Sequence, residues 1–299
     1  RMASLLEAHG VRRGERVLLV LPDMPPFAWA FFGVLARGAV VAMGNPEAPA
    51  SSIEYLVKYT RATAVVTIPK VAEALLAAGE GVLREVVRVW VCPEAATGDD
   101  PEAPVSSGGG FAPAAKDARF RELAADLAAA SSDWRPVPIH RDEPAIWLFT
   151  SGSTGEPKAN VHTHRDFMWN TEIYAKATVG YRRGDVTVSV PRLFFGYATG
   201  TNLMFPFAVG GVAGLFSERP TPESIAKAIT RYRATVVTNV PTMLGKLLEF
   251  DAAARARGER GLDLASVRFS LSAGEALPGP LLSRWLERFG SEVYDGIGS

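Results

Sequence analysis

A string rich in glycine, serine and threonine that ends in lysine is the part of this sequence best suited to chemistry. Directly after the apolar run Ala145–Phe149, it reads Thr150, Ser151, Gly152, Ser153, Thr154, Gly155, Glu156, Pro157 and Lys158. The glycines let the backbone curl with its N–H groups pointing inward, the hydroxyls add hydrogen-bond donors, and Lys158 adds a mobile positive charge. These groups predict a loop that holds a polyphosphate. The alternative for such a string is a hairpin turn that binds no ligand.

The string differs from the common nucleotide-binding P-loop. That motif places lysine directly after its second glycine and continues into a helix. Here Glu156 and Pro157 intervene, and the β-prone residues 159–162 follow. We therefore predict a phosphate loop that leads into a strand.

Two further glycine-containing strings follow predicted strands near the end of the sequence. The first, Ser272–Pro278, reads SAGEALP, and the second, Tyr294–Ser299, reads YDGIGS. Taken alone, Ser272–Glu275 also fits a helix N-cap region, and Asp295–Gly298 fits an ordinary turn at the end of a strand.

Short apolar runs alternate with helical patterns along the chain. The runs that predict strands are Val17–Leu21, Val40–Met43, Ala64–Thr67, Val86–Val91, Ala145–Phe149, Val186–Val190, Val212–Leu215, Val236–Asn239, Val267–Leu271 and Glu292–Tyr294. The patterns that predict helices are Ile53–Thr60, Val71–Ala78, Phe167–Thr178, Pro222–Tyr232, Thr242–Arg257 and Pro280–Phe289. This alternation predicts an α/β fold with mainly parallel sheets flanked by helices. Thr221 before Pro222 predicts an N-cap followed by proline at the first helical position.

One stretch interrupts the alternation and suggests a division of the chain. Pro93–Pro138 is rich in Ala, Pro, Gly, Ser and Asp, with one expected short helix at Asp117–Ala130. We therefore expect a first βα region at 1–92, a low-complexity excursion at 93–140 and a region at 141–299 that carries the chemical motifs. Because the chain begins within a helical pattern without an initiating methionine and stops just after a strand, we expect a fragment at both ends.

Charge, hydropathy and cysteine content exclude several classes of protein. Lys and Arg total 32, Asp and Glu total 32, and no block of like charge is present, so we expect neither nucleic acid nor a membrane as partner. The apolar stretch Phe27–Met43 is broken by Arg37 and by glycines, which predicts a buried helix and strand rather than a membrane span. Cys92 is the only cysteine, which excludes an internal disulfide and favours a reducing, cytoplasmic setting.

The nine-residue string, together with SAGEALP and YDGIGS in this order and spacing, resembles the motifs of the adenylate-forming superfamily. That superfamily contains acyl-CoA synthetases, nonribosomal adenylation domains and luciferases. The resemblance covers essentially the whole chain and implies part of the large N-terminal, AMP-binding domain, without the C-terminal domain. It implies that the loop binds the phosphates of ATP through Thr150, Ser151, Gly152, Ser153, Thr154, Gly155 and Lys158, with Lys158 and Thr154 as catalytic residues.

The two later strings then correspond to the adenine side of the nucleotide site. The residues implied to bind adenine or AMP are Gly274, Glu275, Ala276, Asp295, Gly296 and Ile297. Asp295 would accept a hydrogen bond from the adenine amino group, and Ile297 would lie against the base where many relatives carry an aromatic residue.

The segment Val190–Gly200 lies where the superfamily has its acyl-pocket motif. Many members carry histidine at the position of Phe195, so the aromatic run around it implies a flat, apolar acyl site. Together with Val161–His164 and Ser217–Pro222, this motif is similar to the benzoate-CoA ligase branch, which includes 2-aminobenzoate-CoA ligases. The implied aryl pocket consists of Phe195, Gly196, Tyr197, Ala198, Ala273, Gly274, Gly296 and Ile297.

The sequence departs from this branch at two places. Benzoate ligases usually carry alanine where this chain has Gly196, and the missing methyl group would admit an ortho amino or hydroxyl substituent on the ring. Ala159 and Asn160 replace the Gly-Val or Gly-Thr that is common after the loop lysine. The second departure is expected to affect the hairpin more than phosphate contact.

The resemblance implies ATP-dependent activation of an aromatic carboxylate to an aryl adenylate and then to a CoA thioester. ATP, Mg²⁺ and coenzyme A are the implied cofactors or co-substrates, and a homodimer is compatible with the family. The Thr-Glu pair for ATP and magnesium, the ribose-binding Asp, the hinge and the C-terminal lysine lie outside these residues, so the chain alone is expected to turn over little substrate. The alternatives are an adenylation enzyme that loads a carrier protein and a non-catalytic domain that binds an aryl acid or nucleotide.

His162 and His164 raise the question of a metal site. At i and i+2 they would share one face of a strand, which is compatible with metal binding. No cysteine or carboxylate with ligand spacing accompanies them, so we expect no metal ligands here and a structural or orienting role.

Overall fold

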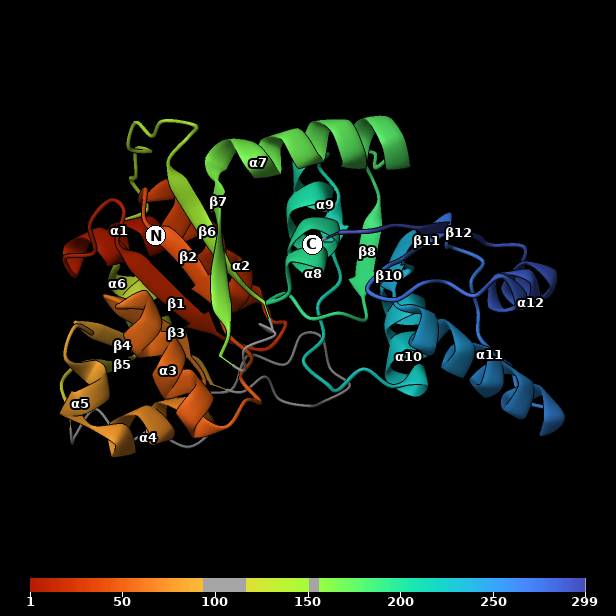
Figure 1. The fold of residues 1–299 in the computed structure, drawn as a ribbon, viewed down its shortest axis with the longest axis horizontal. Coiled ribbons are helices and arrows are strands. Elements are labelled where there is room, and N and C mark those ends of the chain that lie inside the picture. The colour runs from red at the N-terminus through yellow and green to blue at the C-terminus, as the bar shows by residue number, and fades with distance from the viewer. Residues whose placement is uncertain (94–116, 151–155, 299) are drawn as a thin grey trace. The chain divides into compact units, whose positions relative to one another are not determined.

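The computed structural model describes residues 1–93, 117–150 and 156–298. They belong to two compact units, Arg1–Phe167 and Met168–Ser299, and Figure 1 shows the course of the chain through each. Within the described residues, no helix has both the length and the apolar character required to cross a membrane.

The described part of the first unit is built on a seven-stranded sheet with the order β5-β4-β3-β1-β2-β6-β7. The strands are β1 (Arg16–Val20), β2 (Val40–Met43), β3 (Ala64–Thr67), β4 (Arg88–Val91), β5 (Phe120–Glu122), β6 (Pro144–Thr150) and β7 (Lys158–Thr163). All neighbours pair in parallel except β6 and β7, which form an antiparallel hairpin at one end of the sheet.

Helices accompany this sheet in the βα alternation that the sequence predicts (Figure 1). They are α1 (Met2–Ala8), α2 (Pro25–Ala36), α3 (Ala50–Thr60), α4 (Pro69–Ala78), α5 (Glu80–Leu83) and α6 (Leu123–Ala129), with α7 (His164–Trp169) at the end of the unit. The strands β2 and β3 are buried along their whole length, which is expected where helices cover both faces of a parallel sheet.

The described part of the second unit contains a five-stranded, all-parallel sheet with the order β12-β11-β10-β8-β9. Its strands are β8 (Val186–Ser189), β9 (Val212–Ala213), β10 (Val236–Asn239), β11 (Phe269–Ser272) and β12 (Glu292–Asp295). Its helical segments are η2 (Asn170–Val179), α8 (Gly196–Thr199), η3 (Gly200–Met204), α9 (Phe205–Ala208), α10 (Pro222–Tyr232), α11 (Pro241–Ala256) and α12 (Gly279–Phe289), of which η2 and η3 are π-helical.

Local sequence signals explain where several of these elements begin. The Thr221 hydroxyl accepts from the Ser224 amide while the Ser224 hydroxyl accepts from the Thr221 amide, so the predicted N-cap of α10 is confirmed as a capping box. The stretch Phe27–Met43 is confirmed as a buried helix, α2, followed by the buried strand β2. The predicted α/β fold with mainly parallel sheets is therefore correct.

The prediction of one helix over Asp117–Ala130 is wrong in its first half. Phe120 begins the short strand β5, which pairs in parallel with β4, and the helix starts only at Leu123. The reason is burial, since the Phe120 side chain is fully enclosed beside β4. Much of the expected low-complexity excursion, residues 94–116, lies outside the described residues.

A buried carboxylate in the second unit joins two helices and a loop. Asp251 of α11 accepts hydrogen bonds from the Arg288 side chain of α12 at 2.6 and 2.9 Å and from the Leu262 amide at 3.0 Å. Burial opposes ionisation, but the hydrogen bonds from Arg288 and Leu262 outweigh it and lower the pKa of Asp251. A Cβ atom at Gly261 would lie 2.1 Å from Asp251 Oδ1, so only glycine fits in the loop at this point.

We predict that Asp251→Asn lowers the free energy of unfolding at neutral pH by about 2–3 kcal/mol, because Arg288 loses its partner. The folded-state pKa of Asp251 lies below its unfolded value, so its stabilising contribution is present above about pH 4 and is lost as the pH falls through the folded pKa. Urea unfolding at pH 7, 5 and 3 should therefore show the variant and the wild type converging in acid.

Glu259→Gln is the matched control for this prediction. Glu259 forms an exposed pair with Arg257 in the neighbouring loop, and its loss should change the unfolding free energy by less than about 1 kcal/mol. An Asp251→Asn protein as stable as the control at pH 7 would contradict the prediction.

Candidate functional site

The predicted phosphate loop joins the two strands of the β6–β7 hairpin. Thr150 and Lys158 are paired residues in the antiparallel register, so the two ends of the loop lie opposite each other. Lys158 is exposed at the start of β7. The predicted phosphate-binding residues Ser151, Gly152, Ser153, Thr154 and Gly155 lie outside the described residues.

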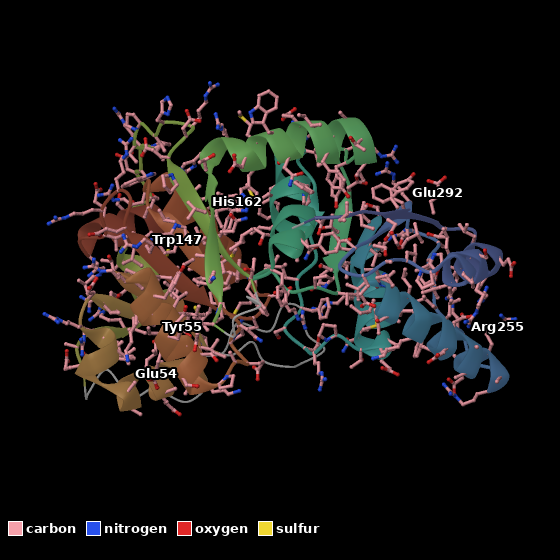
Figure 2. The ribbon with its side chains drawn as sticks, viewed as in Figure 1. Glu54, Tyr55, Trp147, His162, Arg255 and Glu292 are labelled. Carbon is pink, nitrogen blue, oxygen red and sulfur yellow. The ribbon has the colours of Figure 1, made fainter. Side chains whose placement is uncertain are left out.

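Two tyrosines of α3 contact residues that flank the predicted loop in this hairpin. The Tyr55 hydroxyl donates to the Pro157 carbonyl at 2.9 Å, and the Tyr59 hydroxyl accepts from the Ala159 amide at 3.4 Å. Tyr59 also packs edge-on against Trp147 and Phe149 of β6. Figure 2 shows Tyr55 on α3 and Trp147 on β6. The one-turn spacing of the tyrosines places both on the hairpin side of the helix, and they were not among the residues predicted from the sequence.

Contrary to the expectation from their spacing, His162 and His164 do not share one face of a strand. The strand ends at Thr163 and His164 begins α7, so the period-two alternation is broken between them. His162, labelled in Figure 2, lies 3.6 Å from the Asp166 carboxylate and packs against Phe167. Burial lowers the pKa of His164. The structural or orienting role expected for the two histidines stays a prediction.

In the second unit, the two predicted adenine-side strings follow neighbouring strands. Ser272 ends β11 and is paired in register with Asp295, which ends β12. The Gly296 amide donates to the Ser272 carbonyl at 2.8 Å. The structure therefore brings residues 273–276 and 295–297 together at the carboxyl edge of a parallel sheet, where α/β proteins place their ligands.

The loop after β11 is tied to the start of α11. The Thr242 hydroxyl lies 2.9 Å from both carboxylate oxygens of Glu275 and donates to this carboxylate. Gly274 has a φ of +90°, a conformation that favours glycine, and a Cβ atom there would be 4.0 Å from Val240. Ile297 is fully exposed, so its side chain is accessible to a planar group.

The predicted acyl-pocket motif forms the short helix α8 and the residue that precedes it. Phe195 occupies the N-cap position, is half exposed and stacks on Phe194 with ring centroids 4.5 Å apart. The Thr199 hydroxyl donates to the carbonyls of Leu193 and Phe195, which fixes this turn from behind. Gly196 and Ala198 belong to α8, and Ala198 is buried.

Tyr197 brings the acyl-pocket motif close to the end of β12. Burial, reinforced by the neighbouring Tyr174 and Asp295, raises the pKa of the Tyr197 hydroxyl far above its ordinary value. Its oxygen is buried and has no hydrogen-bond partner among the described residues. The Tyr197 side chain is therefore neutral at physiological pH and able to donate or accept a hydrogen bond.

Tyr174 also lies beside Gly296 and Tyr197, and it was not among the residues predicted from the sequence. A Cβ atom built on Gly296 would lie 3.6 Å from the Tyr174 hydroxyl and 3.9 Å from the Ser272 carbonyl. Tyr174 also packs against Phe205, and burial raises its pKa. The helical pattern around Tyr174 did not indicate that this side chain lies beside Gly296, because the two residues are more than a hundred positions apart in the sequence.

Tyr174, Tyr197 and Gly296 thus lie close together at the carboxyl end of β12 in the second unit. Thr150 and Lys158 belong to the first unit. Among the described residues, no three His, Cys, Asp or Glu side chains gather in a way that would hold a metal ion.

Comparison with known proteins agrees with this arrangement. The model of a family described as AMP-binding enzyme matches residues 1–299. The benzoate–CoA ligase of Thauera aromatica is 35% identical over 297 residues, which make up 99% of this chain and 51% of that protein. The anthranilate–CoA ligase of Pseudomonas aeruginosa is 31% identical over 295 residues, 98% of this chain and 50% of that protein.

The fold is shared with a solved structure of similar description. The crystal structure of the anthranilate CoA ligase AuaEII in complex with anthranoyl-AMP matches with a TM-score of 0.85 and 26% identity, over 100% of this chain and 52% of that one. The chain spans about half the length of these relatives. Since the family match extends over all 299 residues, the chain belongs to the AMP-binding, adenylate-forming enzymes.

Proposed function

We propose that the protein to which this chain belongs activates an aromatic carboxylic acid with ATP and transfers the aryl group to coenzyme A. The observation that carries the proposal is the group formed by Tyr174, Tyr197 and Gly296 beside the SAGEALP loop, in a chain similar to ligases named for benzoate and anthranilate. Flat aromatic walls around a glycine suit a planar ring better than a flexible alkyl chain.

The proposed reaction has two steps. A carboxylate oxygen of the aryl acid attacks the α-phosphorus of ATP, which forms the aryl adenylate and releases pyrophosphate. The sulfur of CoA then attacks the acyl carbon, the thioester bond forms, the bond to the phosphate oxygen breaks, and AMP leaves. Neither step requires a covalent bond to the protein, so the chain contributes by positioning and by stabilising charge.

The first unit is proposed to hold the β- and γ-phosphates. Lys158 would supply a positive charge, and the backbone and hydroxyl groups of residues 150–155 would supply donors, with Thr154 among them. Tyr55 and Tyr59 bond to residues that follow the loop, and Tyr59 also packs against Phe149, which precedes it. These contacts support the role, because a loop held at both ends loses less entropy when it binds phosphate.

The second unit is proposed to hold adenine and the aryl ring. Gly274, Glu275 and Ala276 would approach the base through their backbone, while Asp295 would accept from the adenine amino group. The exposed Ile297 would cover one face of the base. The aryl ring would lie against a surface made by Phe195, Gly196, Tyr197, Ala198, Ala273, Gly274, Gly296 and Ile297, to which the structure leads us to add Tyr174.

The setting and the acceptor are further parts of this proposal. A reducing, cytoplasmic location remains a prediction from the single buried cysteine, Cys92. CoA is preferred to a carrier protein as acceptor because the similar proteins named above are CoA ligases. A competition assay that offers the adenylate both acceptors would separate these two alternatives.

A substrate panel tests the proposed function directly. Benzoate, 2-aminobenzoate, hydroxybenzoates and medium-chain fatty acids would each be added to the full-length protein with ATP and Mg²⁺, and pyrophosphate release and thermal stabilisation would be followed. We expect a response to one or more aryl acids that depends on ATP. Preference for fatty acids would overturn the aryl assignment, and no response to any acid would overturn the ligase assignment.

We predict that Lys158→Met lowers kcat/KM for ATP by about 100-fold, because a charge that faces the phosphates is lost. Pyrophosphate release at varied ATP concentration is the measurement. Lys70→Met is the control, since Lys70 is also an exposed lysine of the first unit and pairs only with Glu47 at 2.9 Å in the described structure. Equal activity of the two variants would contradict a phosphate-binding role for Lys158.

We predict that Gly196→Ala changes the ratio of kcat/KM for benzoate to that for 2-aminobenzoate by about tenfold in favour of benzoate. One methyl group in an apolar site is worth about 1–3 kcal/mol of discrimination, and it would occupy the space of an ortho substituent. Gly245→Ala, in α11 where a Cβ atom meets only ordinary contact with Leu281 at 3.9 Å, is the control. An unchanged ratio would show that Gly196 does not set pocket volume.

A further inference from the structure

Several buried polar side chains of the second unit have no hydrogen-bond partner among the described residues, and three of them lie on the neighbouring strands β10 and β11 and share one face of the sheet. These three are Asn239 at the end of β10 and Ser270 and Ser272 of β11, each 1% exposed. The side-chain nitrogen and oxygen of Asn239 and the hydroxyls of both serines have no hydrogen-bond partner among the described residues. Buried polar groups are normally paired, and one left without a partner costs about 1–3 kcal/mol, so this concentration requires a cause.

The three side chains lie on the same face of the sheet. Asn239 is in register with Ser272 and Val237 with Ser270, and paired residues of parallel strands project their side chains to the same side. Val237 is packed in a core that contains Leu247 of α11 and Trp285 of α12. The polar group therefore faces the layer of α11 and α12.

The aromatic group proposed for the aryl ring lies on the opposite face. Val236 and Leu271 alternate with the polar positions and belong to a core cluster that includes Phe205. Tyr174 and Tyr197 pack against this cluster. The polar side chains therefore cannot contact an aryl ring bound beside Tyr197. Any influence they have on ligand binding must act through the backbone that continues from their strands.

Both strands continue directly into the proposed nucleotide site. Ser272 precedes Ala273 and Gly274 of the adenine-side loop, and Asn239 is followed within three residues by Thr242, which donates to Glu275 of the same loop. The hydrogen bond from Thr242 to Glu275 is exposed and ties the loop from outside. Asn239 and Ser272 are buried at the ends of β10 and β11, where these two segments leave the sheet.

We propose that Asn239 and Ser272 hold buried water that supports the adenine-side loop, and that Asn239 is thereby a positioning residue for the nucleotide. Water suits this group because it is small and can both donate and accept hydrogen bonds, as the amide of Asn239 and the hydroxyl of Ser272 require. A water-bridged contact fixes the end of β10 relative to the end of β11, and with it the backbone of residues 273–276. This inference rests on the proposed nucleotide site.

The test is Asn239→Leu in the full-length protein, with the binding of ATP and of the preferred aryl acid measured separately by calorimetry. Leucine has nearly the same shape and removes the unpaired amide, so we expect thermal stability equal to or higher than that of the wild type. The dissociation constant for ATP should rise about tenfold while that for the aryl acid stays unchanged. A purely structural role would change stability without this separation of the two ligands.

A pair of serine substitutions provides the second variant and its control. Ser272→Ala removes a hydroxyl at the loop end of β11 and should weaken ATP binding in the same direction. Ser291→Ala removes another buried hydroxyl without a partner among the described residues, but next to the amino end of β12, away from the loop. It should leave ATP binding unchanged.

The outcomes separate this inference from the function on which it rests. Wild-type protein that binds no adenine nucleotide overturns both. Wild-type protein that binds ATP, with Asn239→Leu and Ser272→Ala variants that bind it equally well, overturns only the positioning role. Equal weakening of ATP and aryl-acid binding in the Asn239→Leu variant would overturn it as well, because it would indicate a general disturbance of the sheet.

Discussion

The parallel register of β10, β11 and β12 is the constraint on which the proposed nucleotide site of the second unit depends. Asn239 is paired with Ser272, and Ser272 with Asp295, so the three strands end side by side at one edge. Each chain segment that leaves this edge is thereby placed next to the others, although the segments are separated by dozens of residues in the sequence. A shift of one residue in any pair would turn its side chains to the other face and move a loop away from its neighbours.

This register is held by a carboxylate at the amino end of the sheet and by a second carboxylate between two helices of the same unit. At the amino end, Asp185 accepts from Arg268 at 2.7 and 2.8 Å and from the Thr235 hydroxyl at 2.9 Å, so residues next to the starts of β8, β10 and β11 are joined by one carboxylate. In the helical layer, Asp251 connects α11 to α12. The polar anchors therefore lie away from the ligand edge, which leaves the residues at that edge available to a substrate.

The sequence was sufficient to predict the fold because its signals are local. Apolar runs of four or five residues predicted most strands to within about two residues, and Thr221 with Pro222 predicted the start of α10. The failure at Phe120 had the opposite origin. A three-residue strand carries too little periodicity to be recognised, and it forms because β4 presents an open edge to it.

Residues of the candidate site could be predicted from the sequence only where several of them are consecutive and form a recognisable motif. SAGEALP and YDGIGS were visible as strings, whereas Tyr174, Tyr59 and Asn239 were not, because each acts through a contact with a distant segment. Periodicity predicts that a helix has a buried face, but it does not say which groups that face meets. Burial of an unpaired amide such as that of Asn239 is likewise a property of tertiary structure alone.

The π-helical form of η2 bears on how such a site can change in evolution. Tyr174 lies within this ten-residue segment, Asn170–Val179, whose wider turns hold one more residue per hydrogen-bonded ring than an α-helix. Deletion of one residue before Tyr174 would let the segment relax toward an ordinary α-helix and would rotate the tyrosine by about 100° around the axis, away from Gly296. Insertions and deletions in this helix, and not only substitutions beside Gly296, would therefore change which side chain faces this edge of the sheet.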